Sequence, residues 1–148
     1  MKFTCSTEIQ LPKERVVELW KNPENFKFWM DGFVKYEHRS GAPGEVGSTA
    51  KIYFKQGNKE LELREVVLIN DLPDLFQARY EHIHMTNTQT VRFEALGESR
   101  THYSSEIAYT EFHSFLPRLM SWLFSSMFKK PVQKWMNQFK AFAEERGV

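Results

Sequence analysis

The stretch that decides the fold is residues 114–146, which read SFLPRLMSWLFSSMFKKPVQKWMNQFKAFAEER. Apolar side chains recur along it at helical spacing, from Leu116 to Phe128 and again from Val132 to Phe142. Ser114 is a suitable N-cap, and Pro131 is expected to kink the helix rather than end it, because proline removes one backbone donor. We therefore predict one long helix with a broad apolar face.

The residues before this helix alternate between apolar and polar side chains with a period of two, which is typical of half-buried strands. The alternation predicts seven strands, at Lys2–Ile9, Phe33–Arg39, Thr49–Lys55, Glu60–Ile69, Leu75–His84, Asn87–Leu96 and Thr101–Glu111. Turn-forming residues between them, such as Gln56-Gly57-Asn58, predict antiparallel hairpins. Two short helices are expected after the first strand, one starting at Pro12 and one capped by Asn22.

These elements predict an α+β fold. An antiparallel sheet with one apolar face must be covered, and the last helix is the only large apolar element left to cover it. We predict a single domain over residues 1–148, in which a curved seven-stranded antiparallel sheet grips the long C-terminal helix across an apolar cavity. Two other folds fit less well: a fatty-acid-binding-type barrel lacks this helix, and a cone-shaped α+β fold usually begins with its helices.

Composition and charge exclude several classes of protein. The net charge is +1 and no basic block is present, so nucleic acid is not an expected partner. Cys5 is the one cysteine, which excludes an internal disulfide and fits a reducing compartment. No signal peptide is evident, and the longest apolar stretch, Phe115 to Phe128, is shorter than the ~20 residues of a membrane span. We expect a soluble, cytoplasmic protein, and its oligomeric state stays open.

Three motifs, together with the closing helix, carry a resemblance to known proteins. They are the opening Ile9…Pro12…Val16…Trp20…Pro23…Phe26…Trp29, the loop Pro43-Gly44-Glu45-Val46-Gly47-Ser48, and the segment Glu65-Val66-Val67…Asp71-Leu72-Pro73-Asp74-Leu75-Phe76. On these residues the whole chain resembles the helix-grip superfamily (SRPBCC type) of START domains, pollen-allergen-like proteins and polyketide cyclase/dehydrase-like proteins. The resemblance implies a cavity for a lipid, quinone, polyketide or hormone, and only some members are enzymes. Pro131 departs from the expected pattern of the closing helix.

The alternation also predicts how the strands pair, because a one-residue slip would turn every core side chain outward. The expected pairs are Ile52 with Leu63, Val67 with Ala78, Glu65 with Tyr80, Tyr80 with Val91, and Phe93 with Tyr103. This register places a polar group on an otherwise apolar inner face, as in a typical small-molecule site. The predicted ligand-binding residues are Glu65, Tyr80, His82, His84, Gln89, Phe93, Tyr103, Ser105, Tyr109, Met120, Phe124 and Met127. Alternatively, the polar residues among them face water at the sheet end or bond to one another in a filled core.

Glu65 is the strongest single candidate for chemistry. The register places it opposite Tyr80 and diagonal to His82, either of which could satisfy a buried carboxylate. Desolvation would raise the pKa of Glu65 and suit it to act as an acid or a base. Because glutamate is rarely buried, we favour the alternative that a bulge at Glu65 turns the side chain outward.

The histidines and the cysteine do not predict a metal site or a nucleophile. His82 and His84 have the same-face spacing of a metal-binding pair, but no third ligand accompanies them, so no metal site is predicted. Cys5 is interpreted as a small core residue rather than a nucleophile. No Gly-x-Ser-x-Gly, phosphate-binding or dinucleotide-binding motif is present, and no cofactor is expected.

The predicted function is binding or transport of a small hydrophobic ligand, such as a lipid, a quinone or a polyketide-like aromatic. The alternative is a cyclase- or dehydratase-type enzyme in which Glu65, His82 or Tyr80 transfers protons, although no strong catalytic motif supports it. A third hypothesis places the segment Phe115–Lys130 on a membrane surface. Packing of the same apolar stripe on the sheet explains that segment equally well and is favoured.

Overall fold

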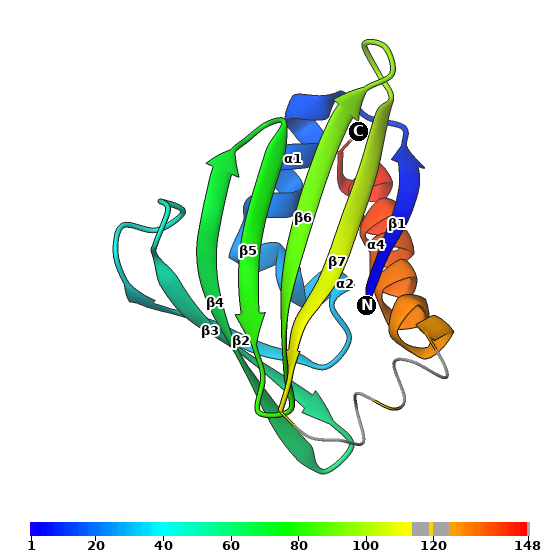
Figure 1. Ribbon diagram of the computed structural model, residues 1–148. Coiled ribbons are helices and arrows are strands. Elements are labelled where there is room, and N and C mark those ends of the chain that lie inside the picture. The colour runs from blue at the N-terminus through cyan, green and yellow to red at the C-terminus, as the bar shows by residue number, and fades with distance from the viewer. Residues whose placement is uncertain (114–118, 120–124, 148) are drawn as a thin grey trace.

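The computed structural model describes residues 1–113, 119 and 125–147. Its elements, in chain order, are β1 (Lys2–Ile9), α1 (Lys13–Lys21), η1 (Pro23–Asn25), α2 (Phe26–Trp29), β2 (Phe33–Ser40), β3 (Thr49–Gln56), β4 (Lys59–Asp71), β5 (Leu75–Glu81), β6 (Met85–Ala95), β7 (Thr101–Phe112) and α4 (Ser125–Arg146). The strands form one seven-stranded antiparallel sheet in the order β1-β7-β6-β5-β4-β3-β2. Helices α1, α2 and α4 lie on one side of the curved sheet (Figure 1). The predicted α+β architecture is confirmed.

The two short helices begin as their residue types dictate. The carbonyl of Pro12 accepts the first helical hydrogen bond from Val16 N, at 3.0 Å, so Pro12 is the extended N-cap of α1 and not its first residue. The side chain of Asn22 accepts from Glu24 N at 3.0 Å, which confirms the predicted cap. The second short helix is a 3₁₀ turn, η1, that runs directly into α2.

Helix α4 lies along the edge strand β1. It continues through Pro131 without ending, as predicted. Gln133 Nε2 donates to the carbonyl of Ser6 at 3.1 Å, and Lys140 Nζ donates to the carbonyl of Glu8 at 2.6 Å. These contacts give polar partners to backbone groups of an edge strand and fix the helix on the sheet.

The first part of the predicted closing helix lies outside the described residues. This part includes the proposed cap, Ser114, and most of the segment for which membrane-surface association was considered. Both ideas therefore stay predictions. Within residues 1–113, 119 and 125–147, no helix is long and apolar enough to cross a membrane.

One hairpin pairs differently from the prediction. Residues of β5 and β6 pair with Tyr80 opposite Asn87 and Phe76 opposite Val91, a four-residue shift from the expected Tyr80–Val91 pair. The turn centres on Ile83 and His84, because His82 and Met85 exchange backbone hydrogen bonds of 2.9 and 3.3 Å. An even shift keeps every side chain on its predicted face, so the apolar alternation alone cannot distinguish the two registers.

The other expected pairs are correct. Ile52 lies opposite Leu63, Val67 opposite Ala78, Glu65 opposite Tyr80, and Phe93 opposite Tyr103. Apolar side chains of β1, β6, β7, α1, α2 and α4 form the main core. Its most deeply buried members include Ile9, Val16 and Phe139, each with no exposed surface.

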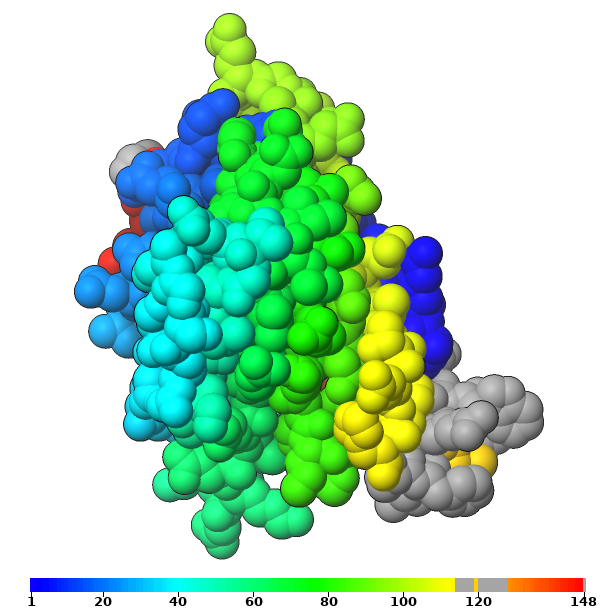
Figure 2. Space-filling model, turned by 60° about the vertical axis from the view of Figure 1, so that its left-hand side comes forward, coloured from blue at the N-terminus to red at the C-terminus, as the bar shows by residue number. Residues whose placement is uncertain are grey.

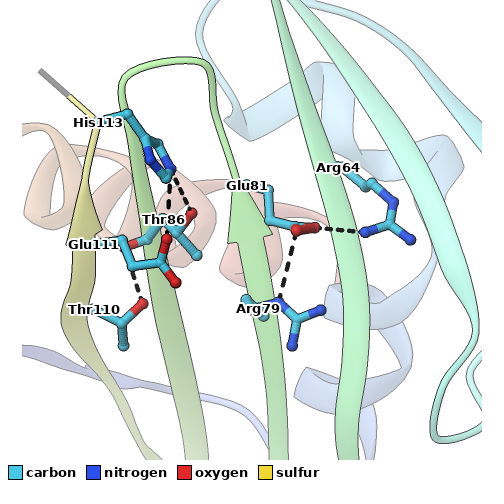
Figure 3. A network of polar contacts seen from close by, with 7 residues as sticks. All are labelled: Arg64, Arg79, Glu81, Thr86, Thr110, Glu111 and His113. Carbon is cyan, nitrogen blue, oxygen red and sulfur yellow. Dashed lines mark hydrogen bonds and ion pairs between the residues drawn. The ribbon is translucent and has the colours of Figure 1, made fainter.

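The outer face of the sheet carries charged side chains such as Lys51, Glu62 and Arg64. None of the described helices covers this face (Figure 2). At the end of the sheet that holds the β5–β6 turn, Arg64 Nη1 contacts Glu81 Oε2 across β4 and β5 at 2.6 Å (Figure 3). Thr86 Oγ1 on β6 lies 3.2 Å from Nε2 of His113, the residue that follows β7. The side chains of Arg64 and Glu81 are partly exposed to solvent, so this ion pair adds little to stability.

Candidate functional site

A cavity of about 930 Å³ lies between the concave face of the sheet and the helices. Among the residues that the structure describes, most of the lining is apolar and ten of the lining side chains are aromatic. These are Trp20, Phe26, Trp29, Tyr36, Phe54, Phe76, Tyr80, Tyr103, Tyr109 and Trp135. A cavity of this size and character matches the pockets in which proteins bind drug-sized molecules.

A row of polar side chains crosses the floor of the cavity. Glu65 on β4 lies opposite Tyr80 on β5, which lies opposite Asn87 on β6, which lies opposite Tyr109 on β7. All four line the cavity. Because directly opposed residues of antiparallel strands point to the same face, the register itself brings these groups together.

Glu65 is buried, with 8% of its surface exposed, and faces the cavity. The Tyr80 hydroxyl donates to one carboxylate oxygen at 2.7 Å, and the Tyr36 hydroxyl donates to the other at 3.4 Å. The irregularity in β4 lies between Val67 and Ile69, beyond Glu65. The interpretation that a bulge at Glu65 turns it outward is therefore wrong.

Tyr36 reaches Glu65 because the strand between them carries a small residue. Tyr36 lies opposite Ile52 on β3, whereas Glu65 lies opposite Ala50. The methyl group of Ala50 leaves room for the phenol ring to extend diagonally across β3 to the carboxylate. Tyr36 was not among the predicted site residues, because β2 and β4 are not adjacent in the sheet.

The environment changes the acid–base properties of this cluster. Burial raises the pKa of Glu65, and the hydrogen bonds from Tyr80 and Tyr36 offset only part of that effect. Burial, followed by the nearby Glu65 carboxylate, raises the pKa of Tyr36 to about 12 and the pKa of Tyr80 well above its usual value of 10.0. Both phenols therefore stay protonated and act as donors at neutral pH, and the raised pKa makes Glu65 a stronger base than an exposed glutamate.

A second polar group lies farther along β6 and β7. Gln89 Nε2 donates to Ser105 Oγ at 2.7 Å, and Trp20 Nε1 donates to the Tyr103 hydroxyl at 3.2 Å. Gln89 and Tyr103 line the cavity, whereas Ser105 is fully buried behind it. Phe93 also lies behind the lining, stacked on the Tyr103 ring with centroids 5.2 Å apart.

The two histidines of the predicted site do not line the cavity. The four-residue shift between β5 and β6 moves His82 and His84 into the turn, where His84 is exposed. His84 N donates to His82 Nδ1 at 3.2 Å, and burial followed by the neighbouring His84 lowers the pKa of His82. The predicted diagonal contact between His82 and Glu65 is therefore absent.

Of the three residues predicted from the closing helix, Met120 and Phe124 lie outside the described residues, and the side chain of Met127 is also not described. Farther along, α4 contributes Val132, Trp135 and Met136 to the cavity wall. These three belong to the apolar stripe of the helix, but the stripe alone did not show which of its turns faces the open part of the sheet.

Cys5 lies in the hydrophobic core and not in the cavity lining. Cys5 is 2% exposed within the core, its Sγ lies 3.7 Å from the carbonyl of Lys129, and burial raises its pKa. This confirms the interpretation of Cys5 as a core residue. In the described part of the chain, no three histidine, cysteine, aspartate or glutamate side chains are grouped as metal ligands.

Replacing Glu65 with glutamine is expected to stabilise the protein at about pH 7 by on the order of 1 kcal/mol. The folded-state pKa of Glu65 lies above its ordinary value of 4.5, so its protonated form favours folding. That contribution is complete below the ordinary value and is lost as pH rises through the raised folded-state pKa. Urea denaturation should show the largest difference between the two proteins near pH 7 and a smaller one near pH 4.

The matched control is Glu62→Gln, because Glu62 lies on the outer face of the same strand and pairs with Lys51 at 2.7 Å. We expect that change to alter stability by less than about 0.5 kcal/mol. A wild-type protein that is more stable than the Glu65 variant at neutral pH would contradict the desolvated carboxylate.

Solved structures with the same architecture are numerous, and their sequences differ widely from this one. TTHA0849 from Thermus thermophilus has a TM-score of 0.79 at 15% identity, with 100% of each chain covered. The Zhui aromatase/cyclase from Streptomyces sp. R1128 has a TM-score of 0.81 at 11% identity, covering 100% of this chain and 96% of that one. Ara h 8.0201 has a TM-score of 0.74 at 12% identity, covering 99% of both chains.

This protein has the helix-grip fold. The predicted resemblance is thereby confirmed for the fold, over the full length of the chain. No family model matches the sequence, and no curated protein matches it. At these identities the likeness carries the fold alone, so the function of this helix-grip protein has to be argued from its cavity.

Proposed function

We propose that this protein binds a small, largely hydrophobic molecule, with an aromatic or other flat skeleton, in the cavity beneath the closing helix. The observation that carries the proposal is a cavity of about 930 Å³ with mostly apolar walls and a short row of polar groups. Apolar walls favour binding of hydrophobic surface, and the few polar groups orient the ligand. Trp20 and Trp135, on helices on the same side of the sheet, provide flat surfaces for such a skeleton.

The similar structures support the same class of ligand. Two of them are described as aromatase/cyclases, the Zhui protein and the di-domain protein StfQ from the steffimycin biosynthetic pathway. This chain matches 46% of the StfQ chain, with a TM-score of 0.76 at 11% identity. Proteins with this fold thus include aromatase/cyclases, which agrees with the aromatic lining found here.

A direct test uses N-phenyl-1-naphthylamine, a neutral dye whose emission increases when it leaves water. We expect saturable binding with one site per chain and a dissociation constant in the micromolar range, on the order of −8 kcal/mol. Native mass spectrometry of the purified protein should show the same one-to-one stoichiometry. A titration with no saturable signal would contradict the proposal, because a filled interior would leave no space for the dye.

An enzymatic function is the second candidate, and one observation favours it. Glu65 combines a raised pKa with access to the cavity, and the Tyr80 hydroxyl lies 2.7 Å from its carboxylate. Glu65 could remove a proton from a bound substrate while Tyr80 or Tyr36 donates a hydrogen bond to an adjacent oxygen. His82 no longer belongs to this group, since it lies in the β5–β6 turn.

A further inference from the structure

The carboxylate of Glu65 has no positive partner within the described part of the chain. Its contacts there are the Tyr80 and Tyr36 hydroxyls, and no lysine, arginine or histidine affects its pKa. A buried carboxylate is stable only when it is paired or fully hydrogen-bonded, because it has lost its hydration. Two phenol donors leave accepting positions on the two oxygens free, and the side chain lines the cavity.

Two tyrosines contact this carboxylate, and a third aromatic ring packs on one of them. Tyr36 and Tyr80 bond to it directly, and Phe26 packs edge to face on Tyr36 with ring centroids 5.7 Å apart. The faces of aromatic rings carry a partial negative charge, which attracts ammonium groups. A carboxylate beside several rings therefore provides the two features that proteins use to bind organic cations.

The other charged groups of the cavity lining lie at its rim. Among the described residues they are Glu18 and Lys21, both exposed and both on α1. Among the residues that the structure describes, the deep part of the lining is thus aliphatic, aromatic or neutral polar, apart from Glu65. An ammonium group at Glu65 would neutralise this buried carboxylate, whereas an anion would be repelled by it.

We propose that the ligand of this cavity is a hydrophobic molecule that carries one protonated amine, and that the amine pairs with Glu65 beside these aromatic rings. This inference rests on the proposed binding function and adds the class of ligand to it. A neutral ligand of the same shape would leave the carboxylate unpaired, so the structure favours the amine over its neutral counterpart.

The test compares three probes with the same ring system: 1-naphthylmethylamine, 1-naphthylmethanol and 1-naphthoate. At pH 7 they are a cation, a neutral molecule and an anion, and each is measured by displacement of N-phenyl-1-naphthylamine. We expect 1-naphthylmethylamine to bind at least about tenfold more tightly than 1-naphthylmethanol, and 1-naphthoate to bind most weakly of the three.

Two variants assign the preference to one residue. Glu65→Gln removes the charge but keeps an oxygen that accepts from Tyr80, so it should bring the amine-to-alcohol ratio close to one. The matched control, Glu62→Gln, removes an outward-facing carboxylate from the same strand and should leave the ratio unchanged.

The outcomes separate this inference from the proposed function. If the dye and the alcohol bind but the amine has no advantage, or keeps its advantage in Glu65→Gln, the amine inference is overturned and hydrophobic binding stands. If neither the dye nor any naphthyl probe binds, the proposed function fails as well. A tenfold preference that disappears only in Glu65→Gln supports the inference.

Discussion

Replacing Phe139 with alanine is expected to lower the free energy of unfolding by about 3–5 kcal/mol. Phe139 lies on α4 with no exposed surface, and its ring meets Trp29 and Tyr103 edge to face, with centroids 5.2 and 5.6 Å apart. It therefore joins the closing helix to α2 and to β7 in one contact. Alanine would leave a void at that junction, because three separate elements cannot all move inward to fill it.

Urea denaturation followed by tryptophan fluorescence measures this loss, which is a large part of the 5–15 kcal/mol that typically stabilises a domain. The control is Ile83→Ala in the β5–β6 turn, where the side chain is 77% exposed. That change should cost less than about 0.5 kcal/mol. A loss below about 1 kcal/mol for Phe139→Ala would mean that α4 is not held on the sheet by this residue.

Replacing Leu63 with tryptophan is expected to weaken binding of N-phenyl-1-naphthylamine at least about a hundredfold, or about 2.7 kcal/mol. Leu63 is half-buried on the floor of the cavity, opposite Ile52 and two residues before Glu65. An indole at this position would extend into the space that the ligand needs. Because the larger side chain would extend into the open cavity rather than into the packed core, we expect the free energy of unfolding to change by less than about 1 kcal/mol.

The control for this variant is Glu62→Trp, one residue earlier on the same strand. Successive side chains of a strand point to opposite faces, so this indole would lie on the outer surface and leave dye binding unchanged. Equal affinities of Leu63→Trp and the wild type would show that the dye binds elsewhere. Loss of binding in both variants would point to a general effect of tryptophan on β4.

Glu65 interrupts the apolar alternation along the inner face of β4. The alternation of β4 places Leu61, Leu63 and Val67 on the inner face, and a glutamate between them costs solvation energy. Residues that conflict with the apolar pattern of their strand are uncommon, and those that occur are concentrated at functional sites. Both the expected stabilisation by Glu65→Gln and the proposed amine ligand follow from the desolvation of this carboxylate. Glutamine removes the buried charge, and a bound ammonium group would neutralise it.

Much of the inner face could be predicted, because direct cross-strand neighbours follow from alternation and turn positions. Tyr80, Gln89, Tyr103 and Tyr109 line the cavity as the alternation suggested. Glu65 does so as well, although the interpretation favoured from the sequence was that a bulge turns it outward. The histidines were placed wrongly for a local reason. The expected β5 strand was extended to His84, whereas the chain turns earlier.

The sequence by itself determined the seven strands, the helices around them and the face to which each strand residue points, since these depend on local periodicity. Only the tertiary structure decided the register between β5 and β6, because an even shift leaves the alternation intact. It also decided the contact of Tyr36 with Glu65 and the contribution of Trp20 and Trp135 to the cavity. Both join elements that are not neighbours in the sheet, so neither follows from the alternation along one strand or from the turns between adjacent strands.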